Sequence, residues 1–208
     1  MFRMARRGCT ASCLGCLLPV LVAVGLVVFC LRQMTTPPSY PQVLPASPAA
    51  VHLAVSQALH RALSLQQPVV LVSLDDAEAT YLLREGLAGY AGLSNLQVHV
   101  LSGSVVVSGG TALLSHPLVI SGPVGLTSGG GSVIAITFRG LWVGQLGLPA
   151  PAPQLLTKTM HPTFTWPVQA SGETYTLACY AAHQNDLVVG FQSPAAGPKA
   201  AQACAGAG

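Results

Sequence analysis

The feature that most constrains this chain is an uncharged stretch that runs from Gly8 to Leu31. It is long enough for the roughly 20 residues that a helix needs to span a bilayer, and a proline such as Pro19 is tolerated inside such a helix. The neighbouring arginines are unevenly placed, with three before the stretch and one after it: Arg3, Arg6, Arg7 and Arg32. Because positive charge beside a span stays in the cytoplasm, we expect Met1 inside the cell and the chain after residue 32 outside it.

A cleaved signal peptide is the competing interpretation of this stretch. Such a peptide has an apolar region of about 7–15 residues, followed by a small-x-small cleavage site. Here the apolar run is longer, and the residues after it are RQMTTPP. The sequence therefore favours an uncleaved signal-anchor, in which residues 1–32 form a short arginine-rich start and a single transmembrane helix in the cell membrane.

The cysteines divide into two groups. Four lie in or beside the uncharged stretch: Cys9, Cys13, Cys16 and Cys30. We interpret these as small apolar residues of a membrane helix, in preference to lipidation sites or a helix–helix seam. Cys179 and Cys204 lie in the part expected outside the cell, where an oxidising compartment would allow a disulfide. The sequence leaves their pairing open.

The composition argues against one broad class of partner. Only 7% of residues are charged, against about 25% in a typical soluble protein. After Arg32 the chain has five basic and six acidic residues, so its net charge is 5 − 6 = −1. A nearly neutral domain has no basic face for a phosphate backbone, and we expect no nucleic-acid binding.

Two low-complexity segments flank one domain. Residues 33–50 are rich in proline, and we expect an extended, semi-rigid stalk that holds the domain up to roughly 50 Å from the bilayer. Residues 194–208 are rich in alanine and glycine, and we expect them to be disordered. Residues 51–193 between them are long enough for one extracytoplasmic domain.

The first part of this domain is predicted to be helical with one strand. Apolar positions recur at helical spacing from Val51 to Leu65, with Val51, Val55, Leu59 and Ala62 along one side. A β-branched strand is expected at residues 68–74. A second helix follows, because Asp75 and Glu78 have the spacing of a capping box.

The second part is predicted to be mostly β-strand. Ser102-Gly103 and residues 183–186 have the features of hairpin turns, and a short helix is expected after Pro153. Residues 134–146 alternate with period two, which gives one sheet face a strongly apolar surface. We therefore expect an α+β domain, with a curved, mainly antiparallel sheet packed on two or three helices.

Reactive side chains do not form a pattern that predicts an enzyme. The histidines lack the HExxH spacing of a zinc site, SGGGS lacks the Lys-Ser/Thr of a phosphate loop, and no serine has the flanking glycines of a nucleophile elbow. Asp75, Asp76 and Glu78 are explained by the positive end of a helix dipole. The best remaining arrangement for catalysis is His99 or His183 near Asp186. We expect a non-catalytic protein without a metal site or a cofactor.

The order of these motifs resembles bacterial cell-envelope proteins of the YpmS and LmeA-like type. The shared features are a single N-terminal membrane segment, the strand and capped helix VVLVSLDDAEATYLL, the strands NLQVHVLSGSVVVSGG and the corner WVGQLGLPAP. The resemblance covers most of residues 51–192 and departs at Asp75, where Thr or Ser is usual, and in an additional hairpin after the last helix. It implies a tubular lipid-binding fold, in which a curved sheet wraps a long helix around an apolar groove for phospholipid acyl chains.

On this basis we expect the lipid groove to be formed by the late strand and the helix after it. Its predicted lining residues are Ile134, Ile136, Phe138, Trp142, Leu146, Leu155, Leu156 and Met160. Gly140 and Gly144 would let the strand bend at the mouth of the groove. Two alternatives stay open. These residues could fill an ordinary core without a cavity, and the domain could be a tethered structural or adaptor module that docks another envelope protein.

Overall fold

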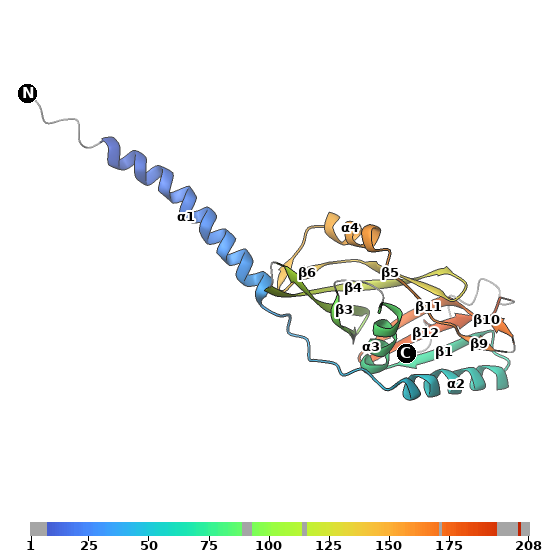
Figure 1. The fold of residues 1–208 in the computed structure, drawn as a ribbon. Helices are drawn as coiled ribbons and strands as arrows, with labels where there is room; N and C mark the ends of the chain where they lie inside the picture. Colours follow the sequence, from blue (N-terminus) through green and yellow to red (C-terminus); the bar gives the residue numbers. More distant parts are fainter. Residues whose placement is uncertain (1–7, 89–92, 114–115, 171, 195–203, 205–208) are drawn as a thin grey trace, which may run out of the picture.

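The computed structural model describes residues 8–88, 93–113, 116–170, 172–194 and Cys204, with the side chains of residues 8–18, 113, 116 and 170 outside the description. Within these residues the chain has four helices and mainly antiparallel strands, so the predicted α+β class is confirmed. Figure 1 shows a long N-terminal helix, α1, that projects from one end of the domain. Helix α2 and helix α4 lie on opposite sides of the sheets.

Helix α1 (Gly8–Thr35) is continuous through Pro19. Its apolar side chains are exposed from Val20 to Phe29. The hydroxyl groups of Thr35 and Thr36 donate to carbonyl oxygens of the last turn, which satisfies acceptors that a helix end leaves unpaired. In the part of the chain whose side chains are described, no helix is long and apolar enough to cross a membrane.

The proline-rich segment after α1 lies along the domain. The Tyr40 ring stacks on the His99 ring with 4.8 Å between centroids. The Val43 amide donates to the Gln97 side chain at 3.3 Å, and the Ala46 amide donates to the Ala77 carbonyl at 2.9 Å. The expected free stalk is therefore wrong. Proline keeps this segment extended, but its amides and its aromatic ring find partners on the domain.

The next elements follow the predicted pattern. Helix α2 (Pro48–Ser64) begins at Ser47, whose hydroxyl accepts from the Ala50 amide, and strand β1 (Val69–Leu74) follows it. Helix α3 (Asp76–Gly86) has the predicted capping box. The Asp75 carboxylate accepts from the Glu78 amide at 2.8 Å, and the Glu78 carboxylate accepts from the Asp75 amide at 3.1 Å.

The larger sheet has five antiparallel strands in the order β2-β3-β4-β5-β8, with a short ribbon at one end. The strands are β2 (Ser94–Leu101), β3 (Ser104–Leu113), β4 (His116–Gly130), β5 (Val133–Phe138) and β8 (Thr163–Thr165). The ribbon pairs β6 (Trp142–Val143) with both β4 and β7 (Leu146–Gly147). Helix α4 (Pro151–Met160) lies at the edge of β5, where the Thr157 hydroxyl accepts from the Phe138 amide at 3.0 Å.

The smaller sheet has the order β1-β12-β11. The C-terminal hairpin of β11 (Thr176–His183) and β12 (Asp186–Gln192) pairs with β1, and β9 (Gln169–Ala170) pairs separately with β10 (Glu173–Thr174). The prediction of one curved sheet is therefore wrong. Strand β12 is buried along most of its length, which favours a central position in a sheet. Strand β1, which is far away in the sequence, pairs with the side of β12 that β11 leaves open.

The hydrophobic core contains side chains from both sheets and from two helices. Val72 and Val189 come from the smaller sheet, Val100 and Ile136 come from the larger one, and Leu83 comes from α3. All of these side chains are buried. The sheets and α3 thus enclose one common core.

The C-terminal segment is joined to β11 by a disulfide between Cys179 and Cys204. Cys204 is buried, with 3% of its surface exposed. The pairing that the sequence leaves open is thus present in the structure. The predicted disordered tail, residues 194–208, lies outside the described residues except at residues 194 and 204.

Candidate functional site

An open groove lies between α2 and α3. Its volume is about 570 Å³, within the range of roughly 300–1,000 Å³ that is typical of ligand sites. Helix α2 contributes Val51, Val55 and Leu59, and α3 contributes Leu82. Helices α2 and α3 make few contacts with each other, and this leaves the groove open between them.

The floor of the groove is formed by Phe164 and Trp166, in and just after β8. Trp166 is held by an edge-to-face contact with Phe191, with 4.8 Å between ring centroids. Its backbone amide donates to the Ser132 carbonyl at 2.9 Å. Phe164 lies so close to α3 that a Cβ atom on Gly86 would come within 2.9 Å of its Cγ. Close packing against a glycine therefore brings this ring to the bottom of the groove.

A second cavity lies directly behind this floor. Its volume is about 40 Å³, and its lining is made of apolar residues, Ile134 and Ile136 among them. Leu82, Phe164 and Trp166 line both the cavity and the groove. These three side chains, here called the partition, are thus shared by the groove and by a small apolar cavity next to it. A void of this size is well below the roughly 150 Å³ that accommodates a benzene-sized guest.

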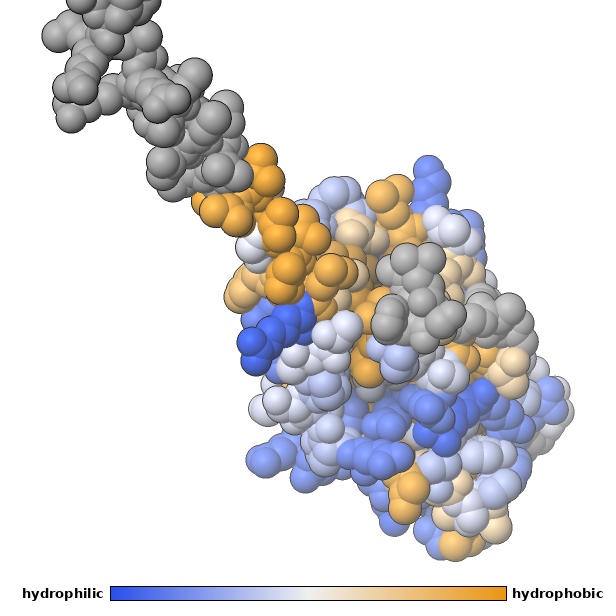
Figure 2. Space-filling model, turned by 60° about the vertical axis from the view of Figure 1, so that its left-hand side comes forward, coloured by the Kyte–Doolittle hydropathy of each residue, from blue (hydrophilic) through white to orange (hydrophobic). Residues whose placement is uncertain are grey.

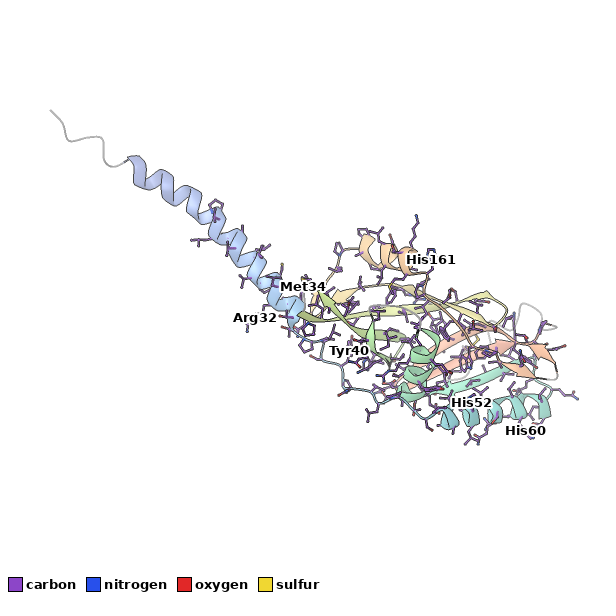
Figure 3. All side chains as sticks on the ribbon, in the orientation of Figure 1. Arg32, Met34, Tyr40, His52, His60 and His161 are labelled. Carbon is purple, nitrogen blue, oxygen red and sulfur yellow. A yellow bond between two sulfur atoms is a disulfide. The ribbon has the colours of Figure 1, made fainter. Side chains whose placement is uncertain are left out.

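The rim of the groove is polar. Its residues include His52, Ser56, Tyr81 and Glu85, and Figure 3 shows His52 on α2. A hydrogen bond to Glu85, together with desolvation, raises the pKa of Tyr81. Glu85 is the only carboxylate among the lining residues. An apolar floor under a polar rim is suited to a ligand with an apolar body and a polar end.

The structure separates the eight residues predicted to line a lipid groove. Ile134 and Ile136 are buried and line the small cavity, and Phe138 is half-buried against the core. Trp142 is exposed by 39% and Leu155 by 62%. The other three are half-buried: Leu146, Leu156 and Met160. The eight residues do not line one groove, because β5 directs its apolar side into the core whereas α4 covers the edge of that strand.

The floor of the observed groove is not predicted by the sequence. The spacing of Val51, Val55 and Leu59 predicts the apolar side of a helix, but it does not indicate which residues lie across the groove from it. Phe164 and Trp166 have the period-two spacing of strand residues, and this was the available signal. Their short strand pairs with only three residues of β5, so the pattern is too brief to identify from sequence.

A buried polar pair lies under the proline-rich segment. The Ser108 hydroxyl and His99 Nε2 are 3.4 Å apart, and both residues are buried. Desolvation lowers the pKa of His99, and the negative charge of Asp76 opposes this shift. Tyr40 covers the His99 ring. A histidine beside a serine has the chemistry of an acid–base pair, and together with Tyr40 the two residues line an open pocket of about 390 Å³.

Metal-ligand clusters are not found in the described part of the chain, where no three of His, Cys, Asp and Glu lie together. A scan of protein-family models, a search of curated proteins and a search of solved structures found no match to this chain.

Proposed function

We propose that this protein is anchored in the cell membrane by residues 8–31, with its domain outside the cytoplasm, and that the domain binds a lipid acyl chain without catalysis. The uncharged stretch and the uneven placement of arginines support the anchor. The exposure of the apolar side chains of α1 from Val20 to Phe29 supports it as well. Such a surface is unfavourable in water and favourable in hydrocarbon.

The observation that carries the lipid proposal is the partition of Leu82, Phe164 and Trp166. These side chains line both a groove of about 570 Å³ and an apolar cavity of about 40 Å³. An acyl chain bound in the groove would contact these three side chains. A shift of the partition would join the two spaces and extend the apolar surface offered to the chain.

The energy of this binding comes from burial of methylene groups. Each buried methylene contributes about 0.8 kcal/mol. The polar rim would contact the end of the lipid that stays in water, and the carboxylate of Glu85 favours a headgroup that is not strongly anionic. A zwitterionic phospholipid therefore fits the groove better than an anionic one.

The test uses the full chain in phosphatidylcholine vesicles that contain a phospholipid with a photoreactive diazirine in its acyl chain. We expect labelled peptides from α2, α3 or β8 in addition to labelling of residues 8–31. Val55→Trp fills the groove and should lower the labelling of these elements several-fold. Leu53→Trp is the matched control, since Leu53 lies on the same helix and is exposed by 55%.

Two results would overturn the lipid proposal. One is labelling confined to residues 8–31 in a folded wild-type protein. The other is equal labelling of the two tryptophan variants. Either result, together with a protein partner that stays bound after detergent extraction, would favour the tethered adaptor.

A further inference from the structure

Backbone contacts join α1 to the domain at their junction. Helix α1 runs without a break to Thr35, and the Gln33 carbonyl accepts from the Gln145 amide in the β6–β7 turn at 2.9 Å. Gly144 is in the left-handed region, with φ +58°, and the carbonyls of Gln33 and Met34 occupy the place where its Cβ would stand. Figure 3 shows Arg32 and Met34 at this junction.

This contact fixes the distance between the domain and the end of the uncharged stretch. Leu31 and Gln33 are two residues apart, which is about 3 Å along a helix axis at 1.5 Å per residue. A domain hydrogen-bonded at Gln33 cannot stand tens of ångströms away from a bilayer that contains Leu31. It must lie at the membrane surface.

The domain end next to the junction has the side chains of a membrane interface. Trp142 is exposed by 39% in β6, and Leu155 is exposed by 62% on α4. Figure 1 shows β6 beside the end of α1, and α4 above the sheets in the same half of the domain. Apolar side chains gather where α1 meets the domain (Figure 2). Tryptophan is enriched at the headgroup level of membranes, where its ring is partly apolar and its N–H is solvated.

The distribution of charged side chains also fits contact with a membrane. Arg32 and Lys158 are exposed cations on α1 and α4. The acidic residues lie elsewhere, at α3, at β10 and in the β11–β12 hairpin: Asp75, Asp76, Glu78, Glu85, Glu173 and Asp186. Residues 87–172, which contain β6, β7 and α4, include no carboxylate side chain. A surface with cations and no carboxylates is complementary to anionic lipid headgroups.

We propose that the surface formed by Arg32, Trp142, Leu146, Leu155 and Lys158, here called the junction surface, rests in the headgroup layer of an anionic phospholipid membrane, the same membrane that α1 crosses. This inference rests on the proposed anchor and is independent of lipid binding in the groove. The membrane then orients the domain as well as tethering it. The acidic residues lie on elements other than those that form the junction surface.

The test uses tryptophan fluorescence, because the chain has two tryptophans and Trp166 is buried at 8% exposure. The full chain is placed in phosphatidylcholine–phosphatidylglycerol vesicles whose acyl chains are brominated near the headgroup. We expect bromine to quench the wild-type emission, and Trp142→Phe to lose the part of the quenching that belongs to Trp142. Lipid in the groove would also reach Trp166, so only the difference between the two proteins reports on the junction surface. Flotation of both proteins with the vesicles reports whether the anchor holds.

A charge comparison identifies the headgroup preference. We expect quenching of Trp142 to be stronger with phosphatidylglycerol than with phosphatidylcholine alone, and Lys158→Gln to reduce this difference. Arg61→Gln is the control, since Arg61 is an exposed cation on α2, away from the junction surface. Equal effects of the two variants would overturn the preference for anionic lipid.

The remaining outcomes separate the two proposals. Equal quenching of the wild type and Trp142→Phe, with both proteins floating, would overturn the junction surface and leave the anchor intact. Failure of the wild type to float would overturn the anchor and the junction surface together. Labelling of the groove is measured separately and is unaffected by either result.

Discussion

The Sγ atom of Cys204 lies 2.9 Å from the place where a Cβ atom of Gly190 would stand, and Cys179 Sγ lies at 2.7 Å from the same point. The disulfide therefore packs on the bare backbone of β12. Gly190 pairs with Cys179 in the ladder between β11 and β12, which brings the sulfur over this position. A glycine in a buried strand is normally unfavourable, and here it makes room for the cross-link.

We predict that Gly190→Ala destabilises the domain by about 1–3 kcal/mol, because the added methyl group overpacks against two sulfur atoms. Urea unfolding of the full chain in detergent would measure this. The control is a double-mutant cycle in which Cys179→Ala and Cys204→Ala remove both sulfurs. The cost of Gly190→Ala should fall sharply in that background, and an unchanged cost would contradict the prediction.

We also predict that loss of the disulfide lowers the free energy of unfolding by about 3.5 kcal/mol, from the closure of a loop with a sequence separation of 25 residues. Cys204→Ser in oxidising buffer and the wild type in reductant should give matching urea midpoints. A loss much below 1 kcal/mol would contradict the prediction.

The sequence predicted the elements that depend on neighbouring residues. The capping box of Asp75 and Glu78, the turn at Ser102-Gly103 and the hairpin about residues 183–186 are all local patterns, and all three are present. Each depends on side chains a few residues apart, so a short stretch of sequence contains the whole of its cause.

Contacts between distant residues were not predictable in this way. The pairing of β1 with β12, the stack of Tyr40 on His99 and the groove floor at Trp166 each join residues far apart in the chain. The apolar residues of α4 gave a misleading signal, since a helix at a sheet edge leaves Leu155 exposed. Periodicity indicates which side of an element is apolar, but not which element covers it.

The third prediction concerns Gly86, which lies in α3 against Phe164. Replacing a helical glycine by alanine is ordinarily favourable by about 1 kcal/mol. Here the methyl group would collide with the Phe164 side chain, whose Cγ lies 2.9 Å from the added atom. Overpacking costs about 1–3 kcal/mol and should exceed the helical gain. We therefore expect Gly86→Ala to be net destabilising and to displace Phe164 from the partition.

The readout for Gly86→Ala is twofold. Its urea midpoint should be below that of the wild type, and its labelling by the diazirine phospholipid at α3 and β8 should change because the floor of the groove has moved. Phe164→Leu in the same background keeps the Cβ and Cγ atoms that lie nearest to the added methyl group, and should recover little of the lost stability. Stabilisation by Gly86→Ala alone would show that Phe164 moves aside freely.

The last prediction concerns the dependence of stability on pH. Only 2% of the His99 surface is exposed. Desolvation lowers its pKa below the ordinary value of 6.5, and Asp76 opposes the shift. The unfolded chain therefore binds more protons than the folded chain between the two pKa values, so stability rises with pH across this window. Full stability is present above about pH 6.5 and is lost as the pH falls below it.

Glu78 acts with the opposite sign. Burial is the largest cause that raises its pKa above 4.5, so the folded state binds the extra proton and gains stability as the pH falls through the folded pKa.

The loss due to His99 begins at higher pH, and the two effects can be distinguished with variants. We expect urea midpoints of the wild type to fall between about pH 7.5 and about pH 5, and those of His99→Gln to fall less. His52→Gln, an exposed position on α2, is the control and should follow the wild type. Equal losses in the wild type and His99→Gln would show that the histidine under Tyr40 does not control this transition.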